Sequence, residues 1–147
     1  MDIKSWAVGF IEGDGCITIT SKTRGKNSPK HYFYPLLTIQ IRDDDPNIIP
    51  QIEKAIGVKA YVIPRRPSPR TWNTKPSIQA TWKTKEALKA IINLIDTHPL
   101  VGKKAKEYVY WREAVSIYTS KTINHNERNK RIIALKGLIA EVRVYKE

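Results

Sequence analysis

The hydrophobic pattern of the chain passes through the same order of periods twice, and this repeat limits the possible folds more than any other feature. Residues 3–13 have the spacing of a short helix, with Asp2 available as its N-cap. Two stretches of alternating apolar and polar residues follow, and then a helical pattern. Alternation and helical spacing recur between Val58 and Ile95. The order helix, hairpin, helix, hairpin, helix predicts an α+β fold in which helices cover one face of a four-stranded antiparallel sheet.

Turn and cap residues predict where the middle elements begin and end. Asp45-Pro46 predicts the start of the helix after the second strand, with the aspartate as cap and the proline in the first helical position. Gly57 predicts the end of that helix. The third strand is expected at residues 58–63, and a loop rich in proline and arginine at residues 64–71.

The last third of the chain is predicted to be helical. Thr84 is the expected cap of a helix that ends at His98-Pro99. Two further helices are expected at roughly residues 100–120 and 127–145. With 147 residues, of which 41% are hydrophobic, the chain is long enough to form one compact domain, residues 1–147, with a core of its own.

The formal net charge of +12 favours a polyanionic partner, and nucleic acid is the commonest one. A basic but otherwise ordinary soluble protein is the alternative. The distribution of charge favours nucleic acid, because residues 15–42 and 54–85 contain no Asp or Glu and carry 13 of the 26 Lys and Arg residues. These two acid-free stretches are predicted to be two parts of one contact surface.

One face of the predicted sheet carries hydrogen-bonding and basic side chains and no acid. A two-stranded ribbon fits the major groove of duplex DNA, where such side chains can read base edges. A solvated polar sheet face is the alternative, because threonine, tyrosine and lysine are ordinary there. Ser77 shares this face with the residues predicted to contact double-stranded DNA, which are Thr18, Thr20, Lys22, Arg24, Tyr32, Tyr34, Thr38, Gln40, Arg42, Lys59, Tyr61, Arg65, Lys75, Gln79 and Thr81.

Residues 7–15, with the sequence AVGFIEGDG, combine two features that are unusual in a helix. Gly9 and Gly13 lie four residues apart on one helix face, and each costs about 1 kcal/mol relative to alanine, which suggests close approach by another helix. Asp14 follows at the negative end of the helix dipole, near the second acid Glu12. A bound divalent cation such as Mg²⁺ would offset this charge. A plain helix-stop turn at Gly13-Asp14-Gly15 is the alternative.

This stretch resembles the signature of the LAGLIDADG endonucleases. The signature directly precedes a strand, and the order of elements that starts with its helix fits the αββαββα order of that family. The resemblance covers about residues 3–120. Glu12 conserves the acidic character of its position, whereas Ala7 and Val8 depart mildly from the signature. Phe10 and Gly13 are substitutions expected in the family, and the letters that match are Gly9, Ile11, Asp14 and Gly15.

The resemblance implies a site-specific double-strand DNA endonuclease of the homing, intron-encoded type. Asp14 is then the catalytic metal-binding acid, and the Gly13 carbonyl is a further ligand. The expected cofactor is Mg²⁺, with Mn²⁺ able to substitute, and no small-molecule cofactor is expected. One motif in a chain of this length implies a homodimer, with Gly9 and Gly13 in the dimer interface and a long, nearly palindromic target.

The resemblance also implies two further catalytic residues. A polar residue at the end of the second strand falls on Asp43, or on Asp44 if the register differs by one, although a simple acidic helix start explains both. A basic residue after the second hairpin's helix falls on Lys104, with Lys103 as the alternative, and could stabilise charge on the phosphate. A solvated helix start is the other interpretation of these lysines.

Other features restrict the compartment and leave two alternative functions. The single cysteine, Cys16, excludes an internal disulfide framework and a cysteine-based zinc site, and it is expected to pack rather than react. No apolar run is long enough to cross a bilayer, and the N-terminal residues do not have the pattern of a signal peptide. We therefore expect an intracellular protein, in the cytoplasm or nucleoid of a prokaryote or in an organelle. A group I intron RNA maturase and a non-cleaving DNA-binding protein of the same fold are the alternatives.

Overall fold

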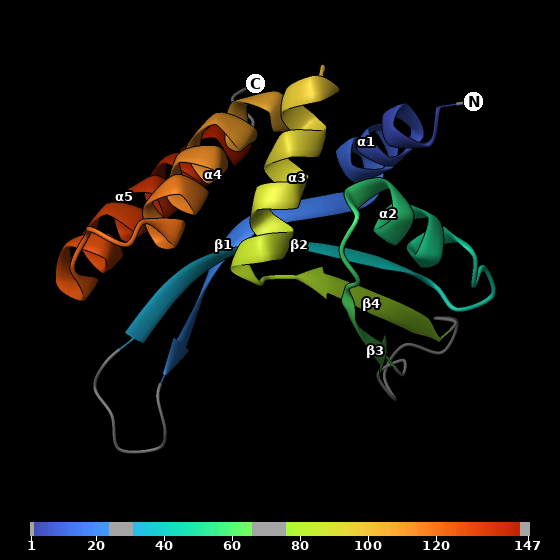
Figure 1. Ribbon diagram of the computed structural model, residues 1–147, viewed down its shortest axis with the longest axis horizontal. Coiled ribbons are helices and arrows are strands. Elements are labelled where there is room, and N and C mark those ends of the chain that lie inside the picture. The colour runs from blue at the N-terminus through green and yellow to red at the C-terminus, as the bar shows by residue number, and fades with distance from the viewer. Residues whose placement is uncertain (1, 24–30, 66–75, 145–147) are drawn as a thin grey trace. The chain divides into compact units, whose positions relative to one another are not determined.

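The computed structural model describes residues 2–23, 31–65 and 76–144. The strands form one four-stranded sheet in the order β1-β2-β4-β3, and the pairs β2–β4 and β3–β4 are antiparallel. The predicted α+β fold is therefore confirmed. In chain order the elements are α1 (Ile3–Asp14), β1 (Gly15–Thr23), β2 (His31–Arg42), α2 (Ile48–Ile56), β3 (Tyr61–Arg65), β4 (Ser77–Trp82), α3 (Lys85–Thr97), α4 (Lys104–Thr119) and α5 (His125–Arg143) (Figure 1).

The chain divides into two compact units. The first comprises the described residues of Met1–Cys16 and Leu37–Leu100, and the second those of Ile17–Leu36 and Val101–Glu147. In the first unit, α1, α2 and α3 contact one another and lie on one side of the paired strands β2, β4 and β3 (Figure 1). The core of this unit is aliphatic, because the apolar stripes of the helices meet the apolar face of the strands, and it includes Ile11, Ile39, Ile52, Leu88 and Ile91.

The register of the first unit confirms the predicted division of the strands into two faces. Ile39 lies opposite Ala80, and Ala80 opposite Val62, so one face is apolar. On the other face, Gln40 lies opposite Gln79. Because side chains alternate along a strand, a shift of one residue would exchange these two sets completely, and the buried Ile39 and Ala80 therefore fix the register.

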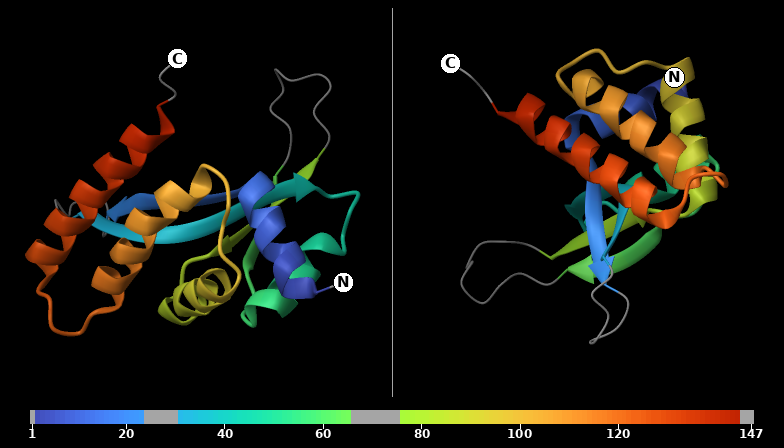
Figure 2. Two further views of the ribbon diagram at one scale, coloured as in Figure 1. Left: turned by 90° about the horizontal axis from the view of Figure 1, so that it is seen from above. Right: turned by 90° about the vertical axis from the view of Figure 1, so that its left-hand side faces the viewer.

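In the second unit, α4 and α5 lie side by side and are tied to the strands by side chains (Figure 2). The indole N–H of the fully buried Trp111 donates to the carbonyls of Thr18 and Leu36, at 3.2 Å each. The Arg143 guanidinium donates to the Ile17 carbonyl at 2.6 Å, and it also forms an ion pair with Glu107 of α4. Each of these contacts joins residues that are more than 30 positions apart, so local sequence patterns do not predict them.

The side-chain amide of Asn129 makes a pair of hydrogen bonds with the backbone of β2. Its nitrogen donates to the His31 carbonyl at 2.6 Å, and its oxygen accepts the Phe33 N–H at 3.3 Å. These two backbone groups lie two residues apart, with the spacing that a neighbouring strand would pair. The amide of α5 thus takes the place of a strand backbone at this position.

The third strand begins three residues later than predicted, at Tyr61 instead of Val58. Gly57 ends α2 in the left-handed conformation, with φ of 91°, as predicted. The residues after it are held by side chains instead of by a strand ladder: the Trp82 indole donates to the Val58 carbonyl at 2.9 Å, and Glu53 accepts the Ala60 N–H at 2.7 Å. Alternating apolar residues alone do not reveal such contacts.

The start of α2 was also predicted too early. The helix begins at Ile48, and Asn47 occupies the cap position without a side-chain hydrogen bond, so Asp45 is not the cap. The Asp45 N–H instead bonds the Arg42 carbonyl at 3.4 Å, which places residues 43–44 in a turn. The predicted cap Thr84 is confirmed, since its hydroxyl accepts the Ala87 N–H at 3.1 Å.

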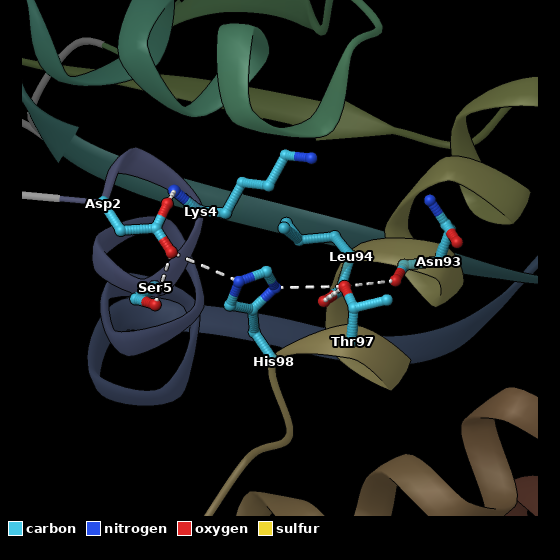
Figure 3. A network of polar contacts seen from close by, with 7 residues as sticks. All are labelled: Asp2, Lys4, Ser5, Asn93, Leu94, Thr97 and His98. Atoms are coloured by element: carbon cyan, nitrogen blue, oxygen red, sulfur yellow. Dashed lines mark hydrogen bonds and ion pairs between the residues drawn. The ribbon is translucent and has the colours of Figure 1, made fainter.

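The predicted N-cap of α1 is confirmed, and it joins a wider network (Figure 3). The Asp2 carboxylate accepts hydrogen bonds from the Lys4 N–H at 3.0 Å and from the Ser5 hydroxyl at 2.9 Å. The same carboxylate lies 3.3 Å from the His98 ring, which contacts the Thr97 hydroxyl at 3.0 Å. The network ties the start of α1 to the end of α3. None of the described helices is both long enough and apolar enough to span a membrane.

Candidate functional site

The C-terminal end of α1 presents an acid to solvent. Asp14 is the last residue of the helix and is exposed, as is Gly13 before it. Gly13 and Asp14 belong to the last turn of the helix, where the final backbone carbonyls lack the N–H donors that a continuing helix would supply. The negative dipole end, these carbonyls and the Asp14 carboxylate gather oxygen atoms and negative charge at one place. Such an arrangement favours a hard cation with oxygen ligands.

The three glycines around this helix end differ in what a side chain would meet. A Cβ atom built on Gly15 would lie 2.8 Å from the Ile11 carbonyl oxygen and 3.0 Å from its Cα, so the close packing of β1 on the last helical turn requires glycine there. A Cβ atom on Gly9 or Gly13 would meet nothing within 4 Å, and both residues are exposed. The described part of the chain therefore gives no packing reason for these two helix-weakening residues.

Two aromatic residues share the face of α1 that carries the exposed glycines. Trp6, Gly9, Phe10 and Gly13 have the i, i+3, i+4, i+7 spacing of one helix face. The Trp6 and Phe10 rings are half-exposed and contact each other, with centroids 5.7 Å apart. The opposite face is buried through Ala7, Val8 and Ile11. The outer face of α1 thus combines two aromatic rings with two positions that carry no side chain.

The polar sheet face of the first unit consists of rows of facing side chains. Thr38 lies opposite Thr81, which lies opposite Tyr61, and in the next row Gln79 lies between Gln40 and Ile63. The Gln40 amide donates to the Ser77 hydroxyl at 2.9 Å. The exposed side chains in and beside these rows are those of Gln40, Arg42, Lys59, Tyr61 and Ile63.

The second unit holds the predicted contact residues of β1 and of the first half of β2. Thr18 and Thr20 are half-buried, and Lys22 is exposed. The half-buried Tyr32 and Tyr34 instead contact helix residues: Tyr32 lies against His125, with ring centroids 4.6 Å apart, and Tyr34 against Tyr118, at 6.5 Å. Less of each ring is therefore available to a ligand than the alternating pattern suggests.

Three predicted contact residues receive little or no structural description. Arg24 and Lys75 lie outside the described residues. Arg65 ends β3, and its backbone pairs with Ser77.

The residues predicted to assist catalysis begin or end elements. Asp43 is the first residue after β2, and its N–H donates to the Pro76 carbonyl at 3.2 Å. Both Asp43 and Asp44 are exposed and belong to the first unit. Lys104, half-buried, is the first residue of α4 in the second unit, and the exposed Lys103 precedes it.

A complete metal site is not formed by the described residues of one chain, since no three His, Cys, Asp or Glu side chains gather there. Sequence reasoning was wrong about one residue near this surface and missed another. Cys16 was expected to pack, but it is exposed, on the same strand face as Thr18. Lys83 follows β4 and lies over the Tyr61 ring, with its nitrogen 5.8 Å from the centroid. The alternating pattern gave no reason to examine Lys83, which lies outside a strand.

The family model of the LAGLIDADG endonucleases matches residues 7–115, which include the whole of the first unit after the first turn of α1. The chain belongs to the LAGLIDADG endonuclease family. A relative in Schizosaccharomyces pombe, a probable intron-encoded endonuclease Cox1-I1b, is 29% identical over 129 residues, which are 86% of this chain and 30% of the relative.

Solved LAGLIDADG endonucleases have the same fold. The archaeal intron-encoded homing endonuclease I-Vdi141I, solved with DNA, has a TM-score of 0.75 at 15% identity, over 98% of this chain and 87% of that protein. The homing endonuclease I-LtrWI, solved with its target DNA, has a TM-score of 0.77 at 21% identity, over 96% of this chain and 45% of that protein. This chain thus spans less than half the length of several relatives that it matches.

Proposed function

We propose that this chain is one subunit of a homing endonuclease that binds duplex DNA on its polar sheet face and cleaves it with a divalent metal ion. The observation that carries the proposal is the end of α1, where the exposed Asp14 lies at the negative end of a helix. Family membership and the acid-free rows of β2, β3 and β4 support DNA as the substrate. The name of the fission yeast relative supports an intron-encoded, intracellular protein.

The polar face binds the duplex and sets its position. Threonine and glutamine side chains have donors and acceptors that match base edges in the major groove, and lysine and arginine neutralise phosphates. In the first unit, Gln40 and Gln79 form the central row and are suited to reading bases, whereas Arg42 is exposed and suited to phosphates. Long, nearly palindromic targets follow if two such units act together.

The oxygen atoms at the end of α1 fit part of a Mg²⁺ site, with Mn²⁺ as a substitute. The Asp14 carboxylate and the Gly13 carbonyl would hold the ion, and hard oxygen ligands are those that Mg²⁺ prefers. When bound, the ion supplies activation of water and stabilisation of the leaving oxygen. We assign Asp43 and Lys104 to supporting roles, in orienting the attacking water and in balancing charge on the phosphate.

A second chain is needed because one chain supplies too few ligands for the metal ion. The open face of α1, where Gly9 and Gly13 lie beside Trp6 and Phe10, is suited to close packing against the same helix of another chain. Such packing brings two copies of Asp14 together at a twofold axis, one for each DNA strand. We therefore propose a homodimer in which each chain contributes half of the active site.

Replacement of Asp14 by asparagine tests the proposal. We expect Asp14→Asn to lower the cleavage rate in Mg²⁺ by more than about a hundredfold, because a neutral amide is a poor ligand for the ion. The dissociation constant for DNA, measured in Ca²⁺, should change by no more than about threefold, because binding rests on the sheet face. The substrate is a duplex recovered by selecting cleaved sequences from a random library.

The control is Asp45→Asn, which removes the same charge from an exposed aspartate that caps no helix. It should cleave at the rate of the unmutated chain. Near-normal cleavage by Asp14→Asn would remove this residue from the mechanism. Tight binding without any cleavage by the unmutated chain would instead identify a DNA-binding protein that has lost its activity, and preferential binding of structured RNA would favour a maturase.

A further inference from the structure

A hollow of about 370 Å³ lies in the first unit, between the start of β3, the end of β4 and the start of α3. Thr81 and Tyr61, which face each other in the end row of the polar face, line it together with Lys59, Lys83 and Thr84. The hollow therefore adjoins the surface proposed to bind DNA, at the end farther from Arg42 and Ser77.

Thr81 has an unusual environment for a polar residue. It is 9% exposed, and among the described residues it is the buried polar side chain. Its side chain lines the hollow, so its hydroxyl can form a hydrogen bond with a group bound there.

The charges around the hollow favour an anion. Lys59 and Lys83 are both exposed, and no acidic residue in the described chain lines the hollow. Glu53, whose carboxylate accepts the Ala60 N–H, does not line the hollow, and the Thr84 hydroxyl accepts the Ala87 N–H. The polar side chains that line the hollow are those of two lysines, two threonines and a tyrosine, and all of these can donate hydrogen bonds to an anion.

We propose that this hollow binds one phosphate of the DNA backbone, an inference that rests on the proposed function. A phosphate has the charge for two lysines and the acceptor oxygens for the Thr81 hydroxyl. The end row thus fixes the register of the protein on the duplex, while the glutamine row reads bases. Lys83 becomes a DNA contact, and Lys59 and Thr81 contact the backbone instead of base edges.

The first test compares the salt dependence of DNA binding in two double variants of equal charge. We expect Lys59→Gln/Lys83→Gln to reduce the log–log salt slope by about 0.9, the contribution of one phosphate. The control Lys89→Gln/Lys106→Gln removes two exposed lysines of α3 and α4 that do not line the hollow, and its slope should equal that of the unmutated chain. Equal slopes in the two double variants would overturn the inference alone, whereas an unmutated chain that binds no duplex would overturn the proposed function as well.

The second test is Thr81→Val, which keeps the shape of the side chain and removes the hydroxyl. We expect duplex affinity to fall by about threefold to tenfold, as for loss of a hydrogen bond to a charged group. The melting temperature of the free protein should stay the same or rise, because valine buries a methyl group in place of a polar hydroxyl. A lower melting temperature with unchanged affinity would show that Thr81 is structural and would contradict the inference.

Discussion

At the scale of single residues, Gly15 and its two neighbours in α1 show how one residue type serves different needs. Gly15 is buried where β1 turns away from the helix, and there is no room for a Cβ beside Ile11. Gly9 and Gly13 face open space, so packing within the described part of the chain does not require glycine at either position. A sequence pattern assigns the same letter to both kinds, and only the surroundings in the fold distinguish them.

We expect Gly15→Ala to destabilise the free protein by about 1–3 kcal/mol, the usual cost of overpacking. The new Cβ would lie 2.8 Å from a backbone oxygen, which cannot move without displacing the last turn of α1. The midpoint of denaturant unfolding measures the effect. Gly13→Ala is the matched comparison, and it should leave the monomer as stable or make it more stable. An unchanged midpoint for Gly15→Ala would contradict the close approach described for this residue.

At the scale of elements, α1 is held at its two ends in different ways. Its C-terminal end follows directly into β1, whereas its N-terminal end is fixed by Asp2, which also reaches His98 after α3. The hydrogen bonds from the Ser5 hydroxyl and the Lys4 N–H, with a smaller contribution from His98, hold the pKa of the Asp2 carboxyl below its ordinary value of 3.8. The charged form of Asp2 therefore stabilises the folded chain.

This network predicts a pH dependence for Asp2→Ala. Because the pKa is lower in the folded chain, the contribution of Asp2 is fully present above pH 3.8 and is lost as the pH falls through the folded value. The variant should melt at a lower temperature than the unmutated chain at pH 7, and the gap should close in acid. Melting curves between pH 7 and pH 3 measure this, with Asp45→Ala as a control that shows little gap. A gap that stays constant with pH would exclude the carboxylate as its cause.

Sequence patterns predicted elements better than they predicted boundaries. The alternation of Ile39 with Gln40, and of Ala80 with Gln79, gave the correct faces, because a buried face must repeat every second residue. The start of β3 was wrong because the Trp82 indole and the Glu53 carboxylate bond the backbone before it. Contacts of this kind depend on the completed fold.

The candidate site was predictable to a similar degree. Asp14 was found because its acid follows two glycines in a short, recognisable stretch. Lys83 was not singled out because its place beside Thr81 and Tyr61 in the hollow depends on the fold. The contacts of Tyr32 and Tyr34 with α5 and α4 were equally hidden, since their partners are more than 80 residues away along the chain.

At the scale of the whole molecule, the chain spans less than half the length of several relatives. It contains one helix with the family signature, α1, and this helix has an open face. Whether two chains pair through that face can be tested in the absence of DNA. In a single chain, Gly9 and Gly13 have room for a larger side chain, so substitutions there should leave the fold of the chain unchanged. Effects on assembly and effects on folding are therefore separable.

We expect Gly9→Leu to weaken the dimer at least about tenfold, because the new side chain would hold the two helices apart. Sedimentation equilibrium without DNA measures the dissociation constant. The control is Gly137→Leu, at an exposed glycine of α5 that also has no atom within 4 Å of a built Cβ. That variant should dimerise like the unmutated chain. A stable monomer for the unmutated chain, or equal dimerisation of both variants, would contradict pairing through α1.

The Asn129 amide also affects how the chain behaves in concentrated solution. β4 pairs with β2 only from Leu37 onward, so the beginning of β2 has backbone groups that β4 does not cover. Uncovered strand edges act as templates on which other molecules add their own strands, and the result is aggregation. By bonding the His31 carbonyl and the Phe33 N–H, a helix side chain occupies these groups. The same contact that docks α5 thus protects the chain from polymerising along β2.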